Sequence, residues 1–91
     1  MNIIELNFSG CKYINEVHDE IKNKFDFPEH YGRNLDALWD CLDYYTDEYL
    51  IVKIFSFLVI EKLFDDYSLK IKEIFKRVSV NCPNIKFEFL S

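Results

Sequence analysis

Three short strand-like segments, separated from one another by pairs of helix-like segments, most constrain what this chain can fold into. The strands are expected over residues 3–8, 49–55 and 85–89. In the first and the last of these segments apolar and polar residues alternate, which is typical of strands buried on one side. The middle segment is the most apolar and is interrupted only by Lys53, so we expect it to be the central strand.

The connecting segments carry the apolar periodicity of amphipathic helices. Helices are expected over residues 15–25, 34–44, 56–64 and 65–78. Asn15, Asn34 and Ser56 are predicted to cap the first three helices, because short polar side chains accept hydrogen bonds from the first helical N–H groups. Pro28 prevents the first helix from continuing, and Gly32 is expected to permit a tight bend before the second.

The order of these segments predicts an α/β fold in two layers. Parallel strands need crossover connections, and these are right-handed, so helices on either side of a central strand cover the same face of the sheet. We therefore expect a three-stranded parallel sheet in the order 1-2-3, with the helices packed mainly on one face. The 91 residues are expected to form a single domain, residues 1–91, whose small core is filled largely by nine Phe, six Tyr and one Trp.

Charge and composition exclude several classes of protein. A net charge of −5 opposes direct binding to nucleic acid and favours a basic protein partner, or simply solubility. No apolar run reaches the ~18 residues of a membrane span, and no signal-peptide pattern is present. The three Cys residues lack CxxC spacing, which predicts reduced thiols in the cytoplasm rather than disulfides or a zinc site. We expect no cofactor and no bound metal.

Residues 28–45 hold the most informative local pattern in the chain. On a helix that begins after Asn34, the side chains of Asp36, Asp40 and Asp43 fall within about 60° of one another, and we call these three residues the acidic ridge. The core-facing stripe of the same helix is formed by Leu35, Leu38 and Leu42. The aromatic rings that flank the ridge belong to His30, Tyr31, Trp39, Tyr44 and Tyr45. An acidic surface with an aromatic rim suits docking into a positively charged cleft of another molecule.

Each of these features also has a plain structural explanation. An acid in the first turn of a helix stabilises the helix dipole, which accounts for Asp36, and the other acids can form a solvated face. However, carboxylates four residues apart repel each other, so three acids on one side give up some helix stability. Trp39 can be a boundary core residue, and Cys41 is expected to be a small core residue. His18 is expected to be a packed or solvent-facing histidine rather than a metal ligand.

An enzyme requires more than this pattern offers. Asp36 and Asp40 could in principle hold Mg²⁺, but a hydrolytic metal site normally draws its ligands from several elements. The sequence shows no glycine-rich phosphate loop and no nucleophile with an evident base. We therefore interpret the chain as a binding protein and not an enzyme, and keep a metal-dependent hydrolase as the less favoured alternative.

The same segment resembles a known family. Pro28-Glu29, Tyr31-Gly32 and the run Asn-Leu-Asp-Ala-Leu-Trp-Asp-Cys-Leu from Asn34 to Leu42 are similar to the signature of the barstar family of intracellular ribonuclease inhibitors. A weaker resemblance extends over nearly the whole chain. It implies that the helix from Asn34 and the loop before it plug a ribonuclease active site built from Arg, Lys and His. The inhibitor's carboxylates would then stand in for the phosphates of RNA.

The resemblance also implies roles for individual residues. Asp40 matches the family's central acid, and Asp36 matches a second acid that pairs with an enzyme arginine. The expected partner-binding residues are Asp36, Asp40, Asn34, Trp39, Gly32, His30, Asp43, Tyr44 and Tyr45. The expected partner is a cognate ribonuclease with a basic active site, and we expect a monomer that forms a heterodimer with it.

Several positions depart from the family pattern. His30 stands where the family has a stacking Tyr, Tyr45 where it has a Trp, and Tyr44 where it has a Gly. Arg77 reverses the charge of a family Glu, and Arg33 replaces an acid. These differences indicate an inhibitor that is specific for a different ribonuclease, because specificity often depends on the residues at the periphery of an interface. The alternative is an interaction or immunity (antitoxin) module of the same fold that binds a different basic protein.

Overall fold

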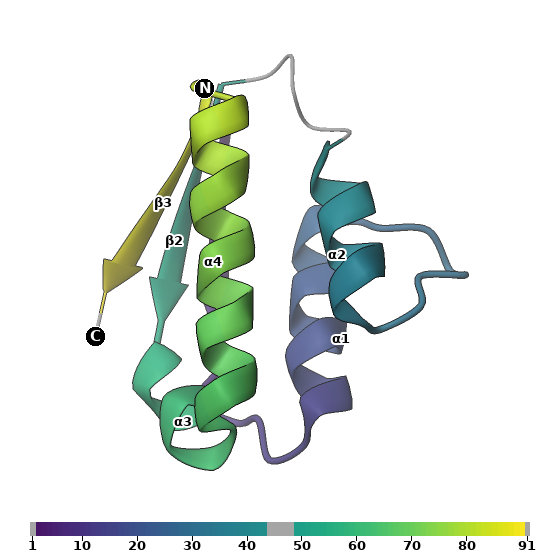
Figure 1. Cartoon of the computed structure of the whole chain (residues 1–91), viewed down its shortest axis with the longest axis vertical. Helices are drawn as coiled ribbons and strands as arrows, with labels where there is room; N and C mark the ends of the chain where they lie inside the picture. Colours follow the sequence, from purple (N-terminus) through teal and green to yellow (C-terminus); the bar gives the residue numbers. More distant parts are fainter. Residues whose placement is uncertain (1, 44–48, 91) are drawn as a thin grey trace.

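The computed structural model describes residues 2–43 and 49–90, and it contains a three-stranded sheet with helices packed against it (Figure 1). In chain order the elements are β1 (Asn2–Asn7), α1 (Ile14–Phe25), α2 (Leu35–Leu42), β2 (Leu50–Phe55), α3 (Phe57–Leu63), α4 (Asp65–Asn81) and β3 (Ile85–Leu90). The strand order is β1-β2-β3, and both strand pairs are parallel. The predicted α/β fold with the middle strand at the centre of the sheet is therefore confirmed.

Side chains from one face of the sheet form the core beneath the helices. Val52 and Ile54 of the central strand are fully buried, whereas the residues that alternate with them are partly exposed. On the opposite face of the two edge strands, Glu5 and Glu88 are exposed. Figure 1 shows α4 running along the sheet, with α1 and α2 beside it. The helices thus lie mainly on one face, as the connection rules predicted.

The predicted cap at Asn15 is wrong, whereas the one at Ser56 is confirmed in position but not in its side-chain hydrogen bond. α1 begins at Ile14, so Asn15 lies within the helix and not at its cap. The Glu16 carboxylate instead accepts hydrogen bonds from the N–H groups of Lys12 at 2.7 Å and Tyr13 at 3.0 Å. Ser56 is the N-cap residue of α3, as predicted, but its side chain makes no capping hydrogen bond and its backbone is left-handed, with φ at 61°.

A buried histidine anchors the connection between α1 and α2 to the rest of the molecule. His18 of α1 is hydrogen-bonded through Nδ1 to the Tyr31 hydroxyl at 2.7 Å and through Nε2 to the Tyr67 hydroxyl at 2.6 Å. Tyr31 belongs to the loop before α2, and Tyr67 belongs to α4. His18 is therefore a packed residue, one of the two predicted possibilities, and it holds the loop that leads to the acidic ridge.

Candidate functional site

The loop before α2 ends in a closely packed helix start. The Asn34 side-chain oxygen accepts a hydrogen bond from the N–H of Ala37 at 2.8 Å, which confirms Asn34 as the N-cap. A Cβ atom on Gly32 would lie 3.1 Å from Asn34 Nδ2 and 3.5 Å from the Ala37 Cβ. The positive φ in this bend belongs to Arg33, at 49°. Gly32 therefore permits a close approach to the cap rather than a left-handed turn.

The three carboxylates of the acidic ridge are exposed to solvent. The other side of α2 faces the core, where Leu38 and Leu42 are fully buried and Leu35 is partly buried. Trp39 is also partly buried and packs against the core. Asp36 lies in the first turn of α2, where its charge also favours the helix dipole. The acids of α2 thus face solvent because its leucines pack in the core on the opposite side of the helix.

The described ion pairs lie away from the acidic ridge. They join Lys22 to Glu29 at 3.7 Å, Lys24 to Glu20 at 3.3 Å, and Arg33 to Asp19 at 2.6 Å. Across residues 2–43 and 49–90, no ion pair involves a carboxylate of the ridge. The pair with Asp19 draws the side chain of Arg33 onto α1, although Arg33 is next to the cap of α2. The ridge therefore has no cationic partner within the described residues.

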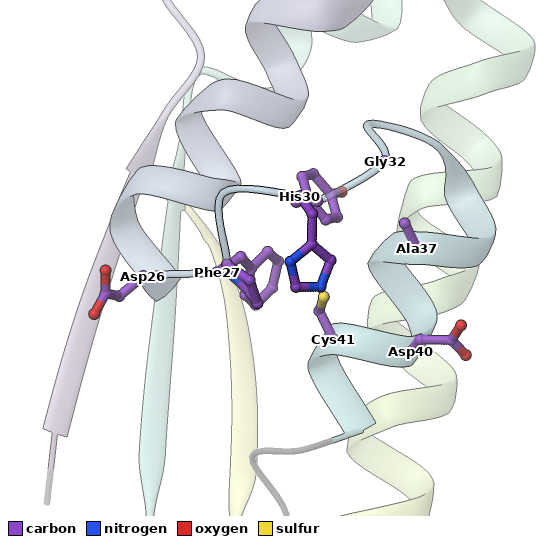
Figure 2. Close-up of a pocket in the computed structure, with 9 residues that line it drawn as sticks. Asp26, Phe27, His30, Gly32, Ala37, Asp40 and Cys41 are labelled. Carbon is purple, nitrogen blue, oxygen red and sulfur yellow. The ribbon is translucent and has the colours of Figure 1, made fainter.

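A hollow of about 620 Å³ lies beside the ridge, between the loop and α2 (Figure 2). It is lined by Asp26, Phe27, Pro28, His30, Tyr31, Gly32, Ala37, Asp40 and Cys41. Figure 2 shows the exposed His30 ring between the Phe27 ring and the Cys41 sulfur, while the Asp40 carboxylate points away from the hollow. The hollow thus combines apolar walls with an imidazole, and Asp40 borders it with its carboxylate directed outward. Such a shape can accept a flat side chain of a partner.

Burial sets the protonation of the groups around this hollow. Burial, together with the neighbouring Asp40 carboxylate, raises the pKa of the Cys41 thiol, which stays protonated and weakly nucleophilic. Burial also raises the pKa of the Tyr31 hydroxyl. For His18, burial lowers the pKa to about 4 against the opposing effect of Asp19, so the ring is neutral near pH 7. These groups support the structure of the site and are not prepared for acid–base catalysis.

Most of the residues predicted for the site lie in one continuous stretch of the described structure. His30 and Gly32 belong to the loop, Asn34 caps the helix, and Asp36, Trp39, Asp40 and Asp43 follow on α2 and at its C-terminal cap. Tyr44 and Tyr45 lie outside the described residues. Cys41 is only partly buried and lines the hollow, so the prediction of a core residue was correct only in part. Phe27 also lines the hollow but was not predicted for the site, because no local sequence pattern distinguishes it from other buried aromatic residues.

The described residues offer little for the alternative of a metal-dependent hydrolase. Among them, no group of three or more His, Cys, Asp or Glu side chains is arranged to hold a metal ion. Asp36 and Asp40 stand on one helix without a ligand from a second element.

Among the described residues, no helix has the length and apolar character needed to cross a membrane.

The fold and the site together define a class of small α/β protein, in which an exposed acidic helix follows a loop anchored to the core. A family model described as Barstar (barnase inhibitor) matches residues 1–90, and the chain therefore belongs to this family. The resemblance found in the sequence is thus confirmed. Because the family is one of inhibitors, membership also supports the interpretation that the chain is not an enzyme.

One curated relative comes from Bacillus subtilis (strain 168) and bears the name "Putative ribonuclease inhibitor YrdF". It is 54% identical to this chain over 46 residues, which cover 48% of this chain and 50% of the relative. The chain thus spans about half the length of the curated relative that it matches.

Proposed function

We propose that this protein inhibits a small basic ribonuclease by placing the acidic ridge and the loop before α2 in the nuclease active site. The observation that carries the proposal is a set of three exposed carboxylates, without ion pairs among the described residues, on a helix of a barnase-inhibitor family member. A ribonuclease holds RNA phosphates with cationic side chains, and carboxylates form strong charge-assisted hydrogen bonds with the same groups.

The arrangement of the ridge suits insertion into a narrow cationic cleft. Asp40 is its central acid and also borders the hollow. Asp36 lies about one turn before Asp40 and Asp43 about one turn after it, so a cleft that receives Asp40 also meets their charges. Trp39 and His30 add partly exposed rings beside the acids, and aromatic groups often form binding hot spots.

The proposal is tested by isolating the partner and by removing the ridge. The purified protein serves as bait in the lysate and culture medium of its host, and the captured nuclease is assayed for inhibition. Asp36→Ala combined with Asp40→Ala should weaken the inhibition constant by at least ~30-fold, because a hot spot usually contributes about 2 kcal/mol or more. Unchanged inhibition by the double variant would remove the ridge from the mechanism.

A matched control removes the same charge elsewhere. Glu5 is exposed on β1 and Asp66 is exposed in the first turn of α4, both outside the ridge. Glu5→Ala combined with Asp66→Ala should change the inhibition constant by less than about threefold, because surface charges outside the interface are largely screened by salt. If both double variants weaken inhibition equally, the total charge of the molecule and not the ridge is responsible, and the proposal fails.

A second candidate function is an interaction or immunity module that uses the same ridge to bind another basic protein. It is favoured by Arg33 and Arg77, which place exposed positive side chains where the family resemblance implies acids. Capture of a basic protein without ribonuclease activity, released by the same ridge substitutions, would support this candidate. Capture of an active ribonuclease would support the first.

A further inference from the structure

The two edges of the sheet differ in what covers them. On β1, Lys24 of α1 donates a hydrogen bond to the C=O of Glu5 at 3.1 Å, and Glu20 of α1 accepts one from the N–H of Asn7 at 2.8 Å. Side chains of α1 therefore occupy this edge. β3 forms the other edge, and Figure 1 shows it on the side of the molecule away from α2, with no helix beyond it.

The pairing of β3 with β2 determines which backbone groups face this open edge. Successive residues of a strand direct their N–H and C=O groups to opposite sides. The N–H of Leu50 in β2 donates to the C=O of Asn84 at 2.9 Å, so by alternation the groups of Lys86 and Glu88 also face β2. Those of Phe87 and Phe89 therefore point to the open edge. Within the described residues, no loop or side chain is hydrogen-bonded to these outward groups.

The open edge is fixed in position and partly apolar. Phe75 of α4 stacks on Phe87, with ring centroids 4.5 Å apart, and Phe57 contacts Phe89 edge-on, with centroids 5.1 Å apart. Phe89 nevertheless remains 41% exposed, and the neighbouring Leu90 remains 38% exposed. A well-supported strand with free backbone groups and exposed apolar side chains is a template for pairing with another strand.

We propose that β3 is a self-association surface, on which β3 of a second copy pairs antiparallel to continue the sheet. The charges of Lys86 and Glu88 favour one register of this pairing. When Phe87 lies opposite its own copy, Lys86 of each chain lies opposite Glu88 of the other, on the exposed face of the sheet. The next permitted register in either direction places Lys86 opposite Lys86 or Glu88 opposite Glu88. Like charges directly opposite each other destabilise a sheet, so pairing about Phe87 is preferred.

This pairing is compatible with the rest of the molecule. Lysine on an edge strand usually discourages association, but here Glu88 of the second copy offers Lys86 an opposite charge. The acidic ridge lies on the far side of the molecule, so both copies keep it accessible (Figure 1). The proposed dimer differs from the monomer expected from the sequence, and it does not depend on whether the ridge binds a ribonuclease.

Sedimentation equilibrium of the full chain tests the proposal. Between about 1 µM and about 500 µM, the mean mass should rise from 11.0 kDa toward twice that value. Lys86→Glu alone, or Glu88→Lys alone, should weaken dimerisation about tenfold, because two cross-strand pairs become repulsive in the dimer. The double variant that exchanges the two charges restores both pairs and should return the dissociation constant to within about threefold of the original.

Three results would overturn this assignment. The chain could remain at its monomer mass at every concentration, the single charge reversals could leave dimerisation unchanged, or the double exchange could fail to restore it. A second measurement does not require any variant to fold. Amide hydrogen exchange at the N–H groups of Phe87 and Phe89 should slow as the protein concentration rises, and exchange that stays fast would place any dimer interface elsewhere.

Discussion

At the scale of single residues, His18 is buried and forms hydrogen bonds through both of its ring nitrogens. The neutral ring donates from one nitrogen and accepts at the other, so one of the two hydroxyls, of Tyr31 or Tyr67, must donate. A protonated ring donates from both nitrogens and leaves that hydroxyl proton without its acceptor. His18 is 0% exposed, so its positive charge would in addition be removed from water. Protonation of this one side chain therefore opposes the folded state.

The stability of the fold should consequently fall on mild acidification. The pKa of His18 is about 4 in the folded state and 6.5 at its ordinary value, so the unfolded chain binds the proton more readily. The stability that the neutral His18 ring contributes is complete above the ordinary pKa of 6.5, and it is lost as the pH falls toward the folded-state pKa of about 4. Linkage gives a loss of about 2 kcal/mol in the free energy of unfolding between about pH 7 and about pH 5. Urea unfolding at the two pH values measures it.

Two variants separate His18 from other acid-sensitive groups. His18→Gln should reduce the pH dependence of the unfolding free energy, since it removes the titrating group. His30→Gln removes the exposed histidine and should leave that dependence as it was. If His18→Gln keeps the full dependence, the loss of stability comes from other groups.

At the scale of elements, α2 depends on the loop that precedes it. The helix has eight residues, too few for stability in isolation, and its start is fixed by the Asn34 cap. Asn34→Ala should lower the free energy of unfolding by about 1 kcal/mol, because the Ala37 N–H loses its acceptor. Asn34→Asp retains an acceptor and should keep most of this stability. Thermal or urea unfolding compares the two variants, and equal stability of all three proteins would mean that the cap is not needed.

The elements and the ridge were predictable because their patterns are local. Alternation along short segments gave three strands, connection rules gave their parallel order, and helical spacing placed the acids away from the leucines of α2. The contacts of His18 were not predictable, since Tyr31 and Tyr67 lie 13 and 49 residues away in the sequence. The hollow was missed for the same reason, because Phe27 and Cys41 meet only after the loop folds over α2. The cap at Asn15 was wrong because α1 begins one residue earlier, where Glu16 binds the backbone that precedes the helix. Ser56 was placed correctly as the N-cap of α3, but its left-handed backbone is not the extended conformation of a usual cap and its side chain makes no capping hydrogen bond.

At the scale of the whole molecule, the two proposed surfaces occupy different sides. The acidic ridge lies on α2, and the open edge of β3 lies away from it across the sheet (Figure 1). The net charge of −5 acts over the entire molecule, whereas the ridge concentrates part of it on one short helix. A concentrated charge of this kind influences how fast a cationic partner arrives, before any contact forms.

Association with a basic partner should therefore slow as salt rises. The association rate constant should fall on the order of tenfold between about 0.05 M and about 0.5 M NaCl, because salt screens attraction beyond the Debye length. Stopped-flow mixing with the captured partner measures this rate. Asp36→Asn combined with Asp40→Asn should flatten the salt dependence, whereas Glu5→Gln combined with Asp66→Asn should leave most of it. A rate constant that does not respond to salt would show that the ridge does not steer the encounter, even if its carboxylates contribute to the final complex.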